Sequence, residues 1–156
     1  MTSYRSVSTL VDFHRVYEHL LSLENYYPDF GTWYWSRAVP DVLHGPGRAI
    51  LAEERGTVVG VALGRSGTDA KLRCIRVAPE AERRGLACHL IDRLLVLINA
   101  DRPEFTVPEE LIHSYARIVV NRYGFDLCYV ERGLYRPGKL EYQFNGLTNH
   151  AVPGAF

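Results

Sequence analysis

Apolar residues recur every three to four positions between Leu86 and Asn99, and this spacing predicts a helix with one buried face. The run before it, Lys71–Val77, contains β-branched residues and stops at Ala78-Pro79, which is typical of a strand. A short polar turn joins the two segments. The centre of the chain is therefore predicted to form a strand, a turn and a helix.

Further strands and helices are predicted on both sides of this centre. Two strands joined at Arg55-Gly56 precede it and should form a meander with it, because apolar residues line both. The first predicted elements are a short strand at 4–7, a helix from Thr9 to about Leu23, and an aromatic helical segment at 24–42 that Pro40 kinks or ends. Strands at 48–54, 57–64 and 71–77 and the helix at 86–99 form the centre. A strand at 104–107, a helix from Pro108 to Tyr123, and strands at 125–131 and 139–144 follow. This order predicts one layered α/β (α+β) domain over residues 1–145 and a loose tail at 146–156.

The turn before the central helix has the features of a phosphate site. The first turn of a helix leaves backbone N–H groups without intrahelical acceptors and carries partial positive charge. Gly85 and Ala87 leave that backbone accessible, and Arg83 and Arg84 add fixed charge beside it. The alternative is an ordinary strand-to-helix turn with solvated arginines.

Composition narrows the classes of function. The chain has 156 residues, with 18 basic and 18 acidic side chains, so no overall positive field favours nucleic acid or an anionic membrane. No stretch is apolar and long enough to suggest a membrane span or a signal peptide. The three scattered cysteines fit neither a disulfide framework nor a zinc cluster. We therefore expect a cytoplasmic protein without a metal.

Two motifs carry a resemblance to a known family. The run Val77–Ala87 resembles the acyl-CoA-binding motif of the GNAT superfamily of N-acyltransferases, although Glu82 stands where that motif has Arg or Gln. Tyr123-Gly124-Phe125 is similar to the family's junction between a helix and a strand. The resemblance implies a mixed, mainly antiparallel central sheet flanked by helices on both faces.

The resemblance also implies a co-substrate, acetyl-CoA or another acyl-CoA, and a set of residues that contact it. The chemistry would be direct transfer of an acetyl or short acyl group to a primary amine. The implied contacts are Ile75, Val77, Glu82, Arg83, Arg84, Gly85, Leu86, Ala87, Cys88 and His113.

The catalytic residues of the family are not at their usual places in this chain. Lys71 stands where a glutamate can serve as base, and Val120 stands where many members have the tyrosine that protonates the leaving thiolate. Tyr115 is our candidate for the acid, although Tyr123 lies on the same predicted helix. Glu53 is our candidate for the base, with the solvated end of a strand as its alternative role.

An aromatic segment near the N-terminus is the candidate acceptor wall. Tyr27, Trp33 and Trp35 could stack against a substrate, or they could simply bury against the sheet. The expected acceptor is a small-molecule amine or the amine of a peptide or protein. The predicted C-terminal strand also offers an edge through which a homodimer could form.

Three other interpretations were weighed. A non-catalytic acyl-CoA-binding regulatory module would account for Val120 and Lys71. Acyl-cysteine chemistry at Cys88, beside His89, would need the two side chains to meet, which neighbours on a helix do not do by default. Nucleotide binding lacks its motifs, because no Gly-Lys-Ser/Thr follows Gly85.

Overall fold

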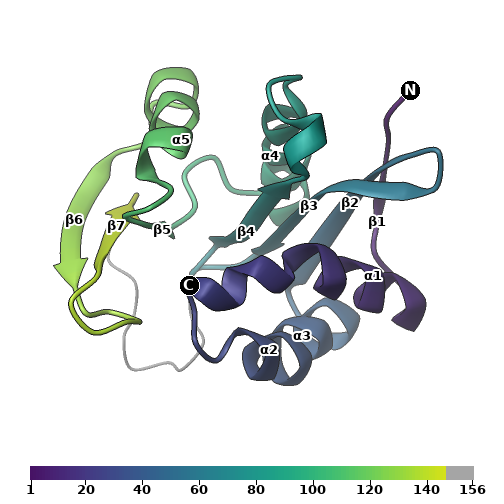
Figure 1. Cartoon of the computed structure of the whole chain (residues 1–156), viewed down its shortest axis with the longest axis horizontal. Coiled ribbons are helices and arrows are strands. Elements are labelled where there is room, and N and C mark those ends of the chain that lie inside the picture. Colours follow the sequence, from purple (N-terminus) through teal and green to yellow (C-terminus); the bar gives the residue numbers. More distant parts are fainter. Residues whose placement is uncertain (147–156) are drawn as a thin grey trace.

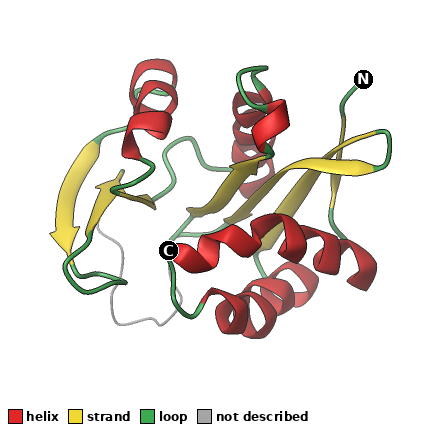
Figure 2. Ribbon diagram, in the orientation of Figure 1, coloured by secondary structure: helices red, strands yellow, loops and turns green. Residues whose placement is uncertain are grey.

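The computed structural model describes residues 1–146 and contains two antiparallel sheets with helices on both faces (Figure 1; Figure 2). The strands are β1 Ser3–Ser6, β2 Gly47–Glu54, β3 Thr57–Arg65, β4 Lys71–Val77, β5 Phe105–Pro108, β6 Leu127–Arg132 and β7 Leu140–Phe144. The helices are α1 Leu10–Leu20, α2 Phe30–Trp33, α3 Val39–His44, α4 Leu86–Ile98 and α5 Ile112–Ala116. Single turns of 3₁₀ helix occupy Leu21–Asn25 and Pro79–Ala81, and π-helical turns occupy Tyr34–Ala38 and Arg117–Arg122.

The first sheet is the predicted meander with β1 added at its edge, in the order β1-β2-β3-β4. All of its pairings are antiparallel, and the β3–β4 pairing shifts register between Leu63 and Gly64. The second sheet has the order β5-β7-β6. The last strand of the chain therefore lies in the middle of its sheet, and the prediction that it offers a free edge was wrong.

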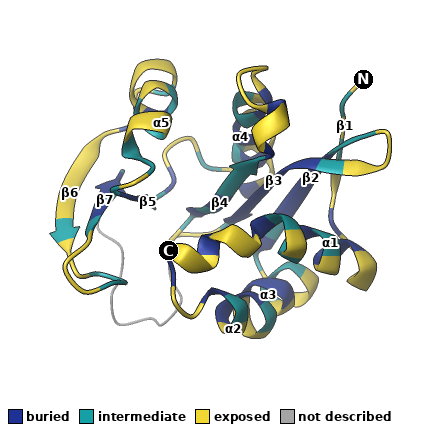
Figure 3. Cartoon of the chain, in the orientation of Figure 1, coloured by how far each residue is buried: buried dark blue, intermediate teal, exposed yellow. Residues whose placement is uncertain are grey.

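Among the described residues, the outer edge of the second sheet, which faces away from β4, belongs to β6 instead. Five of its six residues are exposed, among them Leu127, Tyr129 and Val130, whereas β7 is largely buried (Figure 3). The physical reason is the order of pairing: β7 runs back between β5 and β6 and fills both of its hydrogen-bonding sides. Pairing of two copies through the outer edge of this sheet would therefore involve β6.

The two sheets meet at one point and then separate. Lys71 and Glu104 form a parallel bridge, in which the Glu104 N–H donates to the Ala70 carbonyl at 3.0 Å and the Leu72 N–H donates to the Glu104 carbonyl at 3.0 Å. Within the described chain, no further ladder pairing joins β4 to β5. The facing edges of both strands are therefore left without a strand partner beyond this bridge.

The helices form two layers, one on each side of the first sheet (Figure 1). The segment from α1 to α3 covers one face and buries the aromatic residues Phe13, Phe30 and Tyr34 against Val61 and Leu63 of β3. The other face carries α4, whose buried residues are Leu86, Leu90, Ile91, Leu94 and Ile98, at the predicted helical spacing. Helix α5 lies on the same side as α4, above the second sheet (Figure 1).

Two glycines in β3 allow α4 to lie close to the sheet. A Cβ at Gly60 would stand 2.8 Å from the Cδ1 of Leu90, and one at Gly64 would stand 3.1 Å from the Cδ2 of Leu94. Both distances are below ordinary van der Waals contact, so a side chain at either position would force Leu90 or Leu94 to change its position. These glycines therefore help to set where α4 begins relative to the end of β4.

The two proline predictions have different outcomes. Pro40 does not end its helix but follows an irregular turn within it: Tyr34–Ala38 is π-helical, and Pro40 then falls in the first turn of α3, where its missing N–H costs little. Pro108 does not begin a helix. It is the last residue of β5, a strand whose second edge is open, so its lack of an N–H breaks no ladder bond. The following helix begins only at Ile112.

The second half of that helix is also irregular, because Arg117–Arg122 is π-helical rather than α-helical. The strand after it begins at Leu127, two residues later than predicted. The predicted tail at 146–156 lies outside the described residues except for Gly146. None of the described helices is long and apolar enough to cross a membrane.

Candidate active site

A cavity of about 60 Å³ occupies the space where β4 and β5 separate. Its walls include Leu72–Ile75 of β4 and Phe105–Pro108 of β5. Tyr27 lies on the side of α1 and α2, and Tyr115 lies on the side of α4 and α5. The cavity therefore lies in the opening between the sheets and is lined by residues from both faces of the molecule.

Tyr115 reaches across this opening from α5. Its hydroxyl donates a hydrogen bond to the backbone carbonyl of Ile75 in β4. Burial raises the pKa of Tyr115 to about 12, so the side chain carries its proton at neutral pH. A protonated phenol held at such a cavity can donate a hydrogen bond to a group that gains negative charge during a reaction.

The hydrogen bond to Tyr115 also shows how β4 presents its backbone. The Ile75 carbonyl points away from β3, and the N–H of the same strand residue points to the same side. Val77, two residues on, repeats that direction. Ile75 and Val77 thus turn backbone groups toward the opening.

The loop between β4 and α4 leaves a row of backbone N–H groups available. From Arg83 to Cys88, no N–H has a hydrogen-bond acceptor among the residues that the structure describes, and the first helical bond runs from the His89 N–H to the Gly85 carbonyl at 3.0 Å. Arg83 and Gly85 both have positive φ, at 64° and 80°. This backbone shape gathers several donors at the positive end of a 13-residue helix, which is a suitable cradle for phosphate.

The charged side chains of this loop differ in how they are held. Arg84 is tied to Glu54 at the end of β2, with 3.1 Å between Nη2 and Oε1. Arg83 is exposed and makes no ion pair within residues 1–146. Glu82 is also exposed, and its charge contributes to the raised pKa of Tyr115.

Comparison with known proteins agrees with this geometry. A family model described as "Acetyltransferase (GNAT) family" matches residues 12–101, more than half of the chain. The chain belongs to this acetyltransferase family. No curated protein sequence matches the chain significantly.

Solved structures agree on the fold of this GNAT protein. A GNAT-family structure from Desulfovibrio desulfuricans has a TM-score of 0.74 at 18% identity and covers 92% of this chain and 97% of its own. The ribosomal-protein-S18-alanine N-acetyltransferase of Escherichia coli has a TM-score of 0.68 at 16% identity, with 92% of both chains covered. The PaiA N-acetyltransferase of Thermoplasma acidophilum, solved with coenzyme A, has a TM-score of 0.65 at 11% identity and covers 92% and 98%.

The predicted family and fold are thereby confirmed. GNAT proteins bind acetyl-CoA or CoA and acetylate amine acceptors, including proteins. The chain is a GNAT acetyltransferase that uses acetyl-CoA. Within the described residues, no group of three or more His, Cys, Asp or Glu side chains is arranged to hold a metal ion.

The predicted coenzyme contacts fall into two groups in the structure. Residues 82–88 form the loop and first turn of α4 described above, with Leu86 buried in the core. His113, by contrast, is exposed in the first turn of α5. The carbonyl of Cys88 accepts a hydrogen bond from the Tyr123 hydroxyl at 3.1 Å, so Tyr123 ties its helix to α4 and does not reach β4. This distinguishes Tyr115 from Tyr123.

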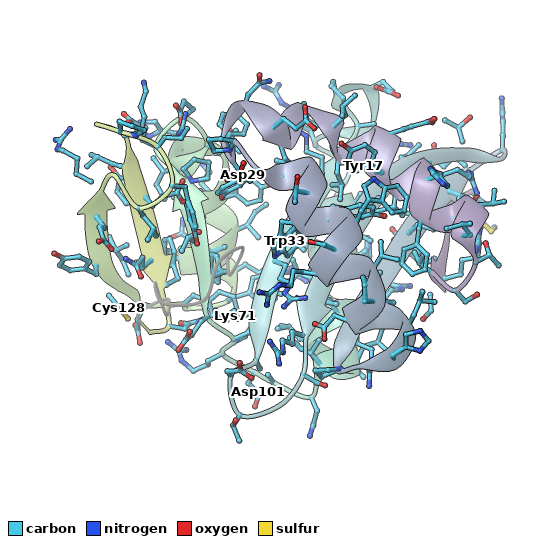
Figure 4. All side chains as sticks on the ribbon, turned by 90° about the horizontal axis from the view of Figure 1, so that it is seen from below. Tyr17, Asp29, Trp33, Lys71, Asp101 and Cys128 are labelled. Carbon is cyan, nitrogen blue, oxygen red and sulfur yellow. The ribbon has the colours of Figure 1, made fainter. Side chains whose placement is uncertain are left out.

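The candidate base Glu53 does not lie with Tyr115. Its carboxylate accepts from Arg15 at 2.6 Å and from Arg5 at 3.0 Å, and these two arginines hold its pKa below the usual value. Glu53 belongs to β2, and β3 separates β2 from β4. Lys71 is buried beside the bridge between the sheets, and burial lowers its pKa (Figure 4).

The three aromatic residues predicted as a substrate wall separate in space. Tyr27 is buried and lines the cavity. Trp33 is buried on α2 (Figure 4), where the Arg73 guanidinium of β4 lies 5.5 Å from its ring centre. Trp35 packs against the rings of His14 and Tyr17 on α1, at 4.6 and 5.5 Å. Only Tyr27 of the three lines the cavity.

Sequence reasoning did not find two residues beside the cavity, Thr106 and Glu141. In the strand Leu140–Phe144, polar and apolar residues alternate, and this pattern predicts that Glu141 and Gln143 face solvent. They are instead buried, at 2% and 0% exposure, because aromatic side chains from distant segments cover that face. Nothing in the local sequence signals this covering.

Proposed function

We propose that this GNAT protein is an N-acetyltransferase that carries acetyl-CoA along the opening between β4 and β5 and transfers the acetyl group directly to a primary amine. The proposal rests on the position of the Tyr115 hydroxyl at the edge of β4, the strand that leads into the loop whose N–H groups are unpaired at the start of α4. The residues present fit the coenzyme, because the loop offers backbone donors for a diphosphate and the cavity offers an apolar passage.

In this arrangement the N–H groups from Arg83 to Cys88 hold the diphosphate, and Arg83 adds its unpaired charge. The N–H groups of Ile75 and Val77 orient the arm that bears the thioester and polarise its carbonyl. The amine attacks the carbonyl carbon, the C–N bond forms, and the C–S bond breaks. Tyr115 then gives its proton to the leaving thiolate. The raised pKa of Tyr115 suits this role, because the side chain stays protonated until it is needed.

The acceptor class is an amine, and its identity belongs to this proposal. A small molecule and a peptide or protein N-terminus both remain open. By its printed name, the Escherichia coli structure belongs to an enzyme that acetylates an alanine of ribosomal protein S18, so a protein amine is within the reach of this fold. We further predict a cytoplasmic enzyme without a metal or nucleic-acid partner; three free cysteines fit a reducing compartment. A homodimer, if formed through a strand, would use β6.

Calorimetric titration with acetyl-CoA and with CoA tests the first half of the proposal. Binding at micromolar concentration, weakened in a variant without Arg83, is the expected result. Absence of binding at millimolar acetyl-CoA would contradict it. Release of free thiol from acetyl-CoA in the presence of a panel of amines and peptides then tests transfer, and a wild-type protein that binds the coenzyme but acetylates nothing would limit the function to binding.

A further inference from the structure

A buried carboxylate stands beside the cavity on the side of α1 and α2. Glu141 is 2% exposed, and neither of its carboxylate oxygens has a hydrogen-bond partner among the described residues. A carboxylate in this situation has lost its hydrating water without gaining a compensating hydrogen-bond donor, which is unfavourable in a protein interior. A group kept under such strain is a candidate for binding a ligand that supplies the missing donors.

The cation nearest to Glu141 favours its ionised form but does not outweigh the effect of burial. Arg136 is the nearest cation, but its guanidinium is already engaged by Glu110 through two hydrogen bonds of 2.8 Å each. On the opposite side, Glu131 of β6 pairs in register with Glu141 and accepts from Gln143 at 3.0 Å. The cluster around Arg136 therefore holds three carboxyl groups, those of Glu110, Glu131 and Glu141, and two cations, Arg136 and Lys139, of which Lys139 lies 3.9 Å from Glu110. The carboxyl groups thus outnumber the cations.

Two tyrosines and a threonine close the space over the carboxylate. The rings of Tyr27 and Tyr135 meet edge to face, with 5.2 Å between their centres. Burial raises the pKa of both tyrosines, and the charge of Glu141 raises it further. Burial raises the pKa of Glu141 to about 8. The titratable and charged groups that face Glu141 are thus Tyr27, Tyr135, Arg136, Glu110 and Glu131.

The same residues connect Glu141 to the cavity that contains Tyr115. Tyr27, Thr106 and Pro108 all line that cavity, and Pro108 is the register partner of Glu141 on the neighbouring strand. The cation that lines the cavity, Arg73, is paired with Asp41 at 2.7 Å. Tyr115 is therefore a proton donor on the α5 side of the cavity. On the α1 side, the carboxylate of Glu141 lies behind the residues that line the cavity.

We propose that Glu141 binds the ammonium group of the acceptor and takes its first proton. This acetyltransferase then selects acceptors whose reacting nitrogen is cationic and whose neighbouring groups are uncharged or cationic. The inference rests on the proposed function, since it places the acceptor opposite Tyr115. Tyr27 and Tyr135 form the aromatic walls of the acceptor site, and their faces favour an alkylammonium. An acidic group next to the amine is excluded by Glu141, Glu110 and Glu131 together.

The proton balance follows from this placement. The acceptor arrives as R–NH₃⁺, and one proton passes from nitrogen to the Glu141 carboxylate and then to solvent. The neutral amine attacks the acetyl carbonyl carbon, and the C–S bond breaks. The second proton leaves the nitrogen as the amide forms, while Tyr115 supplies a proton to the thiolate and is reprotonated. The net products are the acetamide, CoA thiol and one proton.

Two variants of equal size test the role of Glu141. Glu141→Gln removes the proposed acceptor carboxylate, and Glu18→Gln removes an exposed carboxylate of α1 that does not line the cavity. With butylamine, spermidine and an alanine-initiated peptide as probes, we expect Glu141→Gln to lower kcat/KM about 100-fold or more and to remove the rise in rate that accompanies ionisation of Glu141. Glu18→Gln should stay within roughly threefold of wild type. Unchanged kcat/KM and an unchanged pH profile in Glu141→Gln would overturn the proposal.

A second measurement decides the question without turnover. In protein labelled with ¹³C at the glutamate side-chain carboxyl, the Glu141 resonance is the one missing from Glu141→Gln. We expect millimolar butylammonium or spermidine to shift it toward the ionised position, and 1-pentanol, of similar shape but neutral, to leave it in place. If neither amine changes the chemical shift of the Glu141 carboxyl carbon, the inference is overturned. Calorimetry with acetyl-CoA separates this failure from failure of the proposed function, because Glu141→Gln should bind the coenzyme as wild type does.

Discussion

The uncompensated charge of Glu141 predicts a specific dependence of stability on pH, independent of catalysis. The folded-state pKa is about 8, against a reference value of 4.5. A carboxyl whose pKa is raised on folding binds more protons in the native state, so stability falls as pH rises between these two values. At about 1.36 kcal/mol per pKa unit, the interval from 4.5 to about 8 corresponds to roughly 5 kcal/mol. This is an upper bound, because the protein can relax to admit water.

The matched variant isolates this effect from other titrations. In Glu141→Gln the charge is absent at every pH, so its stability relative to wild type should be nearly equal near pH 5 and higher by up to roughly 5 kcal/mol near pH 9. His19, whose pKa burial lowers, titrates in both proteins and cancels. Urea unfolding at a series of pH values measures the difference.

A control and a contrary result complete this test. Arg5 and Arg15 lower the pKa of Glu53, so Glu53→Gln should cost stability by an amount that does not change between pH 6 and 9. The reasoning about Glu141 is wrong if the advantage of Glu141→Gln does not grow with pH. It is also wrong if Glu141→Gln is the less stable protein at high pH, because the carboxylate would then be well compensated in the folded state.

Three further predictions address the site and the layers that position it. Tyr115→Phe should lower kcat about 100-fold or more while the Kd for acetyl-CoA stays constant, as measured by thiol release and calorimetry; equal kcat would exclude Tyr115 as the acid. Gly60→Ala should cost about 1–3 kcal/mol in urea unfolding, because its Cβ would meet Leu90 at 2.8 Å, and a neutral result would contradict the close packing of α4. Gly85 and Gly124 both have positive φ and open space where a Cβ would stand, so Gly85→Ala and Gly124→Ala should lose a similar amount of stability, about 1 kcal/mol. Only Gly85→Ala should weaken binding of acetyl-CoA. Equal binding by both variants would show that the loop is not part of the coenzyme site.

The tyrosine proposed as the acid shows why its position could not be predicted by counting residues along the chain. The position five residues before Phe125 is Val120, and its side chain is 44% exposed. The π-helical turn at Arg117–Arg122 places an extra residue in the turn, so residues before and after it are not related by α-helical spacing. Tyr115, which lies before that turn, is the tyrosine that contacts β4. Only the structure shows which tyrosine faces the opening.

The local sequence alone determined the strand, turn and helix at Lys71–Asn99, the meander before it and the family of the chain. Each depends on short-range physics: the spacing of apolar residues, the positive φ that Gly85 adopts without strain, and the unpaired N–H groups of any helix start. Tertiary structure decided the rest. The opening between β4 and β5, the burial of Glu141 under Tyr27 and Tyr135, and the pairing of Glu53 with Arg5 and Arg15 all join residues far apart in the chain. Such contacts change the solvation and charge of a side chain without changing its local pattern, so no reading of neighbouring residues predicts them.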